Sequence, residues 1–206
     1  MNATAVKRRL LIRIAHRRQL PGSGSARASL LRRTADMKFP DLSPVLGTVE
    51  WAVVGAAAAR LYMPERTTRD LDVLIRAEDG PRARQQLQSA GFAYQGELAI
   101  GGSCWLTPEG FPVDVVERRE PWVAQAVQGA QGNRDPQGLP VIPMPFLVLM
   151  KFLAGRVQDL ADVTRMLGQA DAQGLASVRA LFAQWLPGEQ EDIESLIELG
   201  ALEMER

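Results

Sequence analysis

Two aspartates one residue apart, Asp70 and Asp72, have the types and spacing that most clearly predict chemistry in this sequence. They lie in an apolar segment that predicts a strand. Because side chains alternate along a strand, both carboxylates face one side while Leu71 and Val73 face the other, into a core. Two neighbouring carboxylates repel each other unless a positive charge lies between them. Mg²⁺ is a hard cation that takes carboxylate oxygens and phosphates, so the pair predicts a magnesium site for a phosphorylated ligand.

Two further residues fit the same site. Gly55 follows the short apolar strand expected at 51–54 and precedes a small-residue helix. A glycine there lets the backbone approach a phosphate, while a helix N-terminus offers unpaired N–H groups. Asp114 lies in the middle of the apolar strand expected at 111–116. A lone acid in such a strand either faces water or joins a site, and we expect Asp114 to be a third carboxylate of the magnesium site.

The elements that must position these residues follow from periodicity and turn signals. The predicted strands cover residues 51–54, 70–76, 92–94, 103–107 and 111–116, and the last two should form a hairpin. The predicted helices cover 43–49, 79–90, 121–128, 145–167, 175–186 and 189–204. We therefore expect an α/β (α+β) fold, with a small mixed β-sheet core carrying helices and a helical C-terminal part.

The order of these features resembles the nucleotidyltransferase superfamily related to DNA polymerase β. The chain matches the pattern hG(x)14DhDh followed by hDhh, where h is apolar. Arg66 and Thr68 also match the R-x-T-x-D-h-D form of bacterial members. A downstream pattern, K-x-x-x-x-R-x-x-D-x-x-D-h, resembles the AbiEii-like branch, which includes toxins of toxin–antitoxin systems. It is formed by Lys151, Arg156, Asp159 and Asp162. The resemblance covers about residues 45 to 168.

The resemblance implies an enzyme that moves a nucleoside monophosphate from a nucleoside triphosphate to an acceptor hydroxyl. Asp70, Asp72 and Asp114 would hold Mg²⁺, with Asp114 near the acceptor as metal ligand or general base. The implied nucleotide-binding residues are Gly55, Ala56, Arg66, Thr68, Arg156, Asp159 and Asp162. Lys151 would act catalytically by contacting the triphosphate, oriented by Asp159 or Asp162. Transfer RNA or another RNA is the leading acceptor, a protein hydroxyl or a small molecule stays open, and a cognate antitoxin is a possible partner.

Two observations keep alternatives open. The superfamily turn is usually Gly-Gly or Gly-Ser, whereas this chain has Gly55 and Ala56, which lacks a hydroxyl. This departure favours a second class of function, a catalytically inactive binding or regulatory module. Lys151 lies in an apolar helical run, so it needs a partner. Asp162 follows eleven residues later on nearly the same helical face, and the two could simply form a buried ion pair.

Composition excludes several other classes. The single cysteine, Cys104, rules out an internal disulfide and fits a reducing, cytoplasmic location. Its neighbours predict a strand, so we interpret Cys104 as a small buried hydrophobe rather than a nucleophile. The single histidine, His16, argues against Ser-His or Cys-His catalysis and a histidine zinc site. The sequence contains no run of 18 apolar residues, so no membrane span is expected.

The charges are unevenly distributed along the chain. Residues 1–36 carry nine Lys or Arg and one acid, whereas residues 37–206 carry fifteen basic and twenty-three acidic residues. We interpret 1–36 as a basic disordered tail that is dispensable for folding, as a nucleic-acid arm, or as an over-extended start before a true initiator at Met37. Residues 37–143 are the expected nucleotidyltransferase core and 144–206 the helical C-terminal part.

Overall fold

The computed structural model describes residues 3–22, 38–63 and 68–204. The described chain forms two compact units. The sheet unit contains residues 38–61 and 68–143, and the helical unit contains residues 3–22, 62–63 and 144–204. Each unit is described by itself below.

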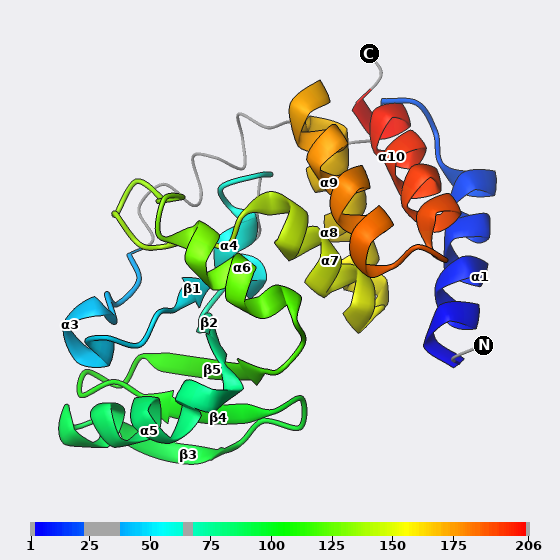
Figure 1. The fold of residues 1–206 in the computed structure, drawn as a ribbon. Coiled ribbons are helices and arrows are strands. Elements are labelled where there is room, and N and C mark those ends of the chain that lie inside the picture. Colours follow the sequence, from blue (N-terminus) through cyan, green and yellow to red (C-terminus); the bar gives the residue numbers. More distant parts are fainter. Residues whose placement is uncertain (1–2, 23–37, 64–67, 205–206) are drawn as a thin grey trace. The chain divides into compact units, whose positions relative to one another are not determined.

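The sheet unit is built on one mixed five-stranded sheet with the strand order β1-β2-β5-β4-β3 (Figure 1). Its strands are β1 (Ala52–Val53), β2 (Leu71–Arg76), β3 (Ala93–Glu97), β4 (Gly102–Leu106) and β5 (Pro112–Arg118). Strands β2 and β5 are parallel, and the other neighbouring pairs are antiparallel. The helices are α3 (Ser43–Leu46), α4 (Gly55–Ala59), the 3₁₀ helix η1 (Ala77–Asp79), α5 (Gly80–Ser89) and α6 (Trp122–Ala130). The predicted mixed α/β core and its β4–β5 hairpin are confirmed.

The two central strands show why this sequence forms a sheet. Leu71, Val73 and Ile75 of β2 are fully buried, as are Val113 and Val115 of β5. These residues alternate along each strand and lie on one face, where they form the core. Branched side chains favour extended backbone and pack well on a pleated surface. The opposite face is left for polar side chains at the start and the end of each strand.

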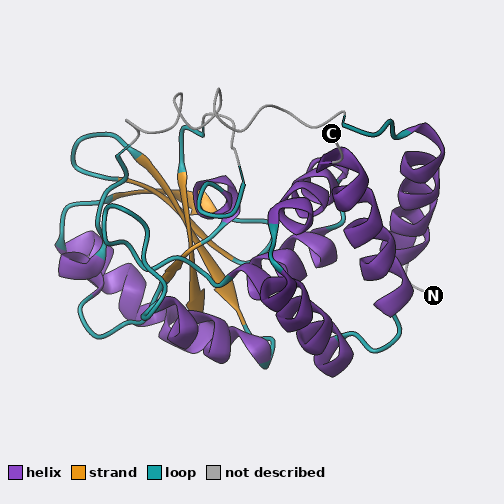
Figure 2. Cartoon of the chain, turned by 90° about the horizontal axis from the view of Figure 1, so that it is seen from above, coloured by secondary structure: helices purple, strands orange, loops and turns teal. Residues whose placement is uncertain are grey.

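The helical unit contains one described helix from the beginning of the chain and four from its end. Figure 2 draws all described helices in purple. They are α1 (Ala3–Arg18), α7 (Met144–Ala154), α8 (Val157–Gln169), α9 (Ala172–Trp185) and α10 (Gln190–Met204). Helices α8 and α10 approach closely through Gly168 and Gly200, since a Cβ added to Gly168 would lie 2.4 Å from the Gly200 carbonyl oxygen. None of the described helices is long and apolar enough to cross a bilayer.

The continuous helix expected over 145–167 is wrong in one respect. The helix ends at Ala154 and a new one begins at Val157. Gly155 adopts a left-handed backbone with φ of +63° and Arg156 is extended with ψ of 152°. Glycine occupies this conformation without a steric penalty and commonly ends helices. The break lets α8 pack against α7 instead of continuing it.

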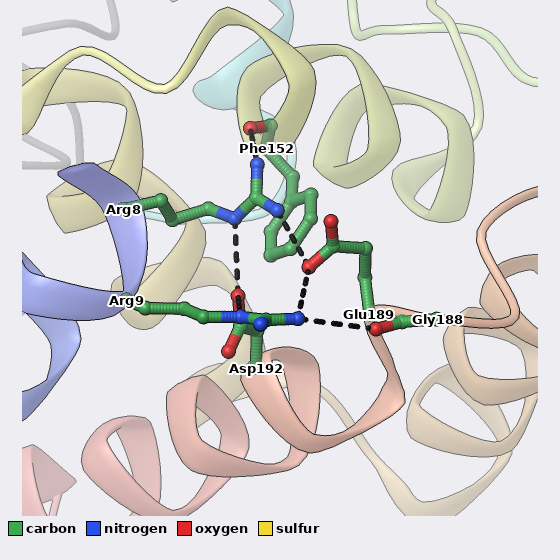
Figure 3. A network of polar contacts seen from close by, with 6 residues as sticks. All are labelled: Arg8, Arg9, Phe152, Gly188, Glu189 and Asp192. Carbon is green, nitrogen blue, oxygen red and sulfur yellow. Dashed lines mark hydrogen bonds and ion pairs between the residues drawn. The ribbon is translucent and has the colours of Figure 1, made fainter. Parts of the chain in front are cut away.

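The disordered tail expected at 1–36 is also wrong over residues 3–18, which form α1. Its docking residue is Arg8, which is only 3% exposed. The Arg8 guanidinium lies 3.8 Å from the Phe152 ring centroid and 2.7 Å from Glu189, and it donates to Asp192 (Figure 3). Arg9 reaches the same two carboxylates at 3.4 Å. Residues 23–36 lie outside the described residues.

Replacing Arg8 with alanine should destabilise the helical unit by about 3 kcal/mol, because Glu189 and Asp192 would lose a buried partner. Urea unfolding followed by circular dichroism would measure the loss. Arg13→Ala is the matched control, since Arg13 is exposed on the same helix, and surface changes usually stay within about 0.5 kcal/mol. Equal stability of the two variants would contradict this role of Arg8 and would support the prediction that the N-terminal segment is dispensable for folding.

Candidate active site

The parallel register of β2 and β5 makes Asp72 and Asp114 direct neighbours. Both side chains are half-buried, whereas Leu71 and Val113, which precede them, are fully buried on the opposite face. Two residues paired in adjacent strands lie about 5 Å apart. The fold therefore places two carboxylates side by side, and the apolar residues on either side of each one prevent the strands from turning them into the core.

Gly55 brings the start of α4 against this pair. Its φ is +63°, and a Cβ added here would lie 1.9 Å from Oδ2 of Asp72. Any other residue would both strain the backbone and displace the carboxylate. The Val54 N–H donates to the Asp72 carbonyl oxygen at 2.9 Å, which fixes the two segments together. Ala56 follows half-exposed, and the next three alanines are buried, so small side chains let α4 pack closely on the sheet.

Asp70 lies just before β2 and has a partner of its own. The Thr68 hydroxyl donates to Oδ1 of Asp70, so Thr68 orients a predicted metal ligand. Both residues are half-buried. Within residues 3–22, 38–63 and 68–204 there is no group of three or more Cys, His, Asp or Glu side chains that could hold a metal ion. The structure thus pairs Asp72 with Asp114, and the convergence of Asp70 with them stays a prediction. Arg66 lies outside the described residues.

Cys104 is a neighbour of the site that sequence reasoning missed. It pairs with Asp114 across the antiparallel β4–β5 ladder, on the same face of the sheet. Burial raises the pKa of the Cys104 thiol to about 11, with further contributions from a hydrogen bond to Asp114 and from its charge. A raised pKa keeps the thiol protonated at physiological pH, which agrees with the interpretation of Cys104 as a small hydrophobe. Cys104 is half-buried rather than buried, and the signal that could have located it is its register with Asp114.

The downstream motif forms a connected network in the helical unit. Lys151 Nζ lies 2.7 Å from Oδ2 of Asp162 and 3.8 Å from Oδ1 of Asp159. Arg156 grips Asp159 through Nε at 2.6 Å and a terminal nitrogen at 3.1 Å. Gln158 donates to the second oxygen of Asp162 at 3.1 Å. Every carboxylate oxygen of the two aspartates therefore has a partner.

Burial shows what this network does for the fold. Lys151, Asp159 and Asp162 are 7%, 2% and 3% exposed. The Lys151–Asp162 pair expected from helical spacing is present, but it joins α7 to α8 across the Gly155 break rather than lying along one helix. The Arg156 side chain is 78% exposed, so this guanidinium keeps a face toward solvent. Contact of these four residues with a nucleotide stays a prediction.

Comparisons with known proteins give structural likeness only. No family model matches the sequence, and no curated protein matches it either. Among solved structures, ANT(2'')-Ia in complex with adenylyl-2''-tobramycin is 14% identical over 84% of this chain and 92% of that chain, with a TM-score of 0.41. A CCA-adding enzyme with CTP is 13% identical over 84% of this chain and 51% of that chain, with a TM-score of 0.39. The CD-NTase CdnG of Bradyrhizobium diazoefficiens, in complex with GTP, has a TM-score of 0.27 at 13% identity, over 95% of this chain and 89% of that chain. Likeness at this level assigns neither a family nor a substrate.

Replacing Gly55 with alanine should destabilise the sheet unit more than the same change at Gly110. Both glycines have positive φ, +63° and +83°, but only at Gly55 would the new methyl group collide with a neighbour. Loss of the left-handed backbone alone costs about 1 kcal/mol. Denaturant unfolding of both variants would isolate the additional cost of displacing Asp72. Equal losses would show that α4 relaxes away from the carboxylate without penalty.

Replacing Lys151 with alanine should cost about 3–5 kcal/mol of stability, because Asp162 would be left buried without its cation. Lys38→Ala, at an exposed lysine, is the control and should be near neutral. The double variant Lys151→Met and Asp162→Leu should recover much of the loss, since both charges are then removed together. A Lys151→Ala protein as stable as Lys38→Ala would contradict the burial of this pair.

Proposed function

We propose that the protein is a metal-dependent nucleotidyltransferase that moves a nucleoside monophosphate from a nucleoside triphosphate to an acceptor hydroxyl. The observation that carries this proposal is the Asp72–Asp114 pair with the Gly55 turn packed against it. Neighbouring carboxylates of like charge favour a cation between them, and Mg²⁺ prefers carboxylate oxygens as ligands.

The residues present fit Mg²⁺. Asp72 and Asp114 supply hard carboxylate oxygens, and the missing Cβ of Gly55 lets the Asp72 carboxylate lie against the start of α4. Asp70, held by Thr68, would be the third ligand. Bound magnesium would neutralise charge on the reacting phosphates and on the leaving pyrophosphate.

The chain's own residues would then divide the remaining work. Asp114 would accept the proton of the acceptor hydroxyl, whose oxygen forms a bond to the α-phosphorus as the bond to pyrophosphate breaks. The backbone N–H of Ala56, at the Gly55 turn, would bind a phosphate oxygen. Lys151 and Arg156 would contact the triphosphate, and Asp159 and Asp162 would orient them.

RNA, including transfer RNA, is the acceptor that we propose first, with a toxin-like role in the cytoplasm and a cognate antitoxin as partner. Its support is the resemblance of Lys151, Arg156, Asp159 and Asp162 to the AbiEii-like pattern. A protein hydroxyl or a small molecule is the other acceptor class. Transfer to total RNA, to protein and to small hydroxyl compounds separates these classes in one set of assays.

One observation favours a second candidate function, an inactive module that binds nucleotides. Ala56 can offer a phosphate only its backbone N–H, since it has no hydroxyl and less backbone freedom than glycine. Such a module would bind a nucleoside triphosphate with magnesium and release it unchanged. Equilibrium binding measured beside label transfer distinguishes a module from an enzyme.

Replacing Asp72 with asparagine should reduce label transfer from a triphosphate more than about 100-fold, since loss of even an indirect metal partner costs 10- to 100-fold. Stability should be unchanged or slightly raised, because repulsion from Asp114 is relieved. Glu109→Gln, at an exposed turn residue, removes a charge elsewhere and should leave transfer intact. Each labelled triphosphate is incubated with magnesium and each acceptor class.

Two outcomes would overturn the proposal. Transfer that survives in Asp72→Asn would remove the role of the carboxylate pair. A wild-type protein that transfers nothing from any triphosphate, yet binds one in the presence of magnesium, would favour the hypothesis of an inactive module.

A further inference from the structure

The parallel strands β2 and β5 also end together in a pair of arginines. Arg76 and Arg118 are direct neighbours in the register, four residues beyond Asp72 and Asp114 and on the same face of the sheet. Four residues along a strand correspond to roughly 13 Å. The buried residues Leu74 and Val116 lie between the two polar pairs. The arginine pair is therefore separate from the carboxylate pair.

A cavity of about 420 Å³ opens at these strand ends. Arg76, Arg118 and Arg119 line it together with Glu78 and Glu120, and the first turn of α6 closes one side through Val123. Ligand sites commonly have volumes of about 300–1,000 Å³. No side chain caps the N-terminus of α6, so the positive end of the helix dipole adds to the three guanidinium groups.

Asp79 holds the Arg76 side chain in place. Its Nε donates to Oδ2 of Asp79 at 2.9 Å, and the Asp79 side chain is only 9% exposed. This hydrogen bond raises the pKa of Arg76 above its ordinary value. The contact occupies Nε and leaves the terminal nitrogens for other partners. A guanidinium fixed in this way loses little entropy when it binds an oxyanion.

Glu78 and Glu120 are counter-ions of the cavity arginines that an anionic ligand could displace. Glu78 contacts Arg76 at 3.5 Å and Glu120 contacts Arg118 at 3.7 Å, both longer than a good ion pair. Their side chains are 73% and 40% exposed. Glu120 also accepts a hydrogen bond from the Arg119 backbone N–H. Carboxylates in these positions occupy donors that suit the oxygens of a phosphate.

We propose that this cavity is a second anion site, which binds the phosphate group of a nucleotide or a polynucleotide. Arg76 and Arg118 grip the phosphate oxygens, and Glu78 and Glu120 swing out into solvent. Planar guanidinium groups match phosphate oxygens in a bidentate geometry. The site does not depend on nucleotidyl transfer, because none of its residues belongs to the carboxylate pair.

Pyrophosphate without divalent metal is the first probe, since chelator then suppresses binding at the carboxylates. Phosphorus NMR titration of the full chain should show binding tighter than about 1 mM. The double variant Arg118→Gln and Arg119→Gln should bind at least tenfold more weakly. Arg82→Gln, at an exposed arginine of α5, should bind like wild type.

A second variant tests the site even where loss of arginines harms folding. Glu78→Gln with Glu120→Gln removes the competing carboxylates while keeping their size, so pyrophosphate should bind several-fold more tightly. Unchanged affinity in both double variants, or no wild-type binding up to millimolar concentration, would overturn the proposal. Failure of label transfer would leave this result unaffected.

The source of the phosphate follows from two further titrations. If the natural ligand is a nucleotide, ADP should bind to the cavity with an affinity that depends little on salt. If the natural ligand is RNA, a short oligonucleotide should bind with an affinity that falls as salt rises. The slope of log affinity against log salt concentration should drop by about one for each arginine removed. Binding of either ligand that is insensitive to Arg118 and Arg119 would count against this cavity.

Discussion

The parallel register between β2 and β5 is the constraint on which the sheet unit depends. It sets Asp72 beside Asp114 at one end of the strands and Arg76 beside Arg118 at the other. Side chains alternate with period two, so a slip of one residue would exchange the two faces of a strand. Asp114 would then enter the core and Val113 would leave it. Burying an unpaired carboxylate is costly, and so is exposing the apolar residues of the core. Both costs hold the register that places the two polar pairs.

Gly55 adds a second constraint, which is the close approach of its backbone to the Asp72 carboxylate. A carboxylate oxygen occupies the volume that any other residue would need for its Cβ, so the turn and the acid specify each other. Glycine takes the positive φ of this turn without a steric penalty, so it is the residue that can lie this close to the Asp72 carboxylate. The neutral Cys104 beside Asp114 adds no further charge to the pair.

The sequence predicts the parts of this structure that depend on local period. The strands around Asp72 and Asp114 follow from alternation. The Lys151–Asp162 pair was expected from the spacing of one continuous helix, but the two residues meet because α8 packs against α7. The break at Gly155 does not follow from local period, because glycine is tolerated inside helices and only tertiary packing decides its φ. The pairing of Arg76 with Arg118 depends on which strands become neighbours, and periodicity carries no such information. Helix α1 was not predicted because Arg8 is the residue that docks it. An analysis of apolar periodicity counts arginine as a surface residue.

Electrostatic complementarity accounts for the docking of helix α1. Helix α1 carries six Lys or Arg residues and no acid, whereas α10 carries five acids and no basic residue. The two helices pack together, and the Arg8–Arg9 cluster joins them through Glu189 and Asp192. Burial and its hydrogen bond to Glu189 raise the pKa of Asp192, while Arg8 lowers that of Glu189. Glu189 and Asp192 each contact both arginines, so Arg8 and Arg9 compensate the two acids at the start of α10.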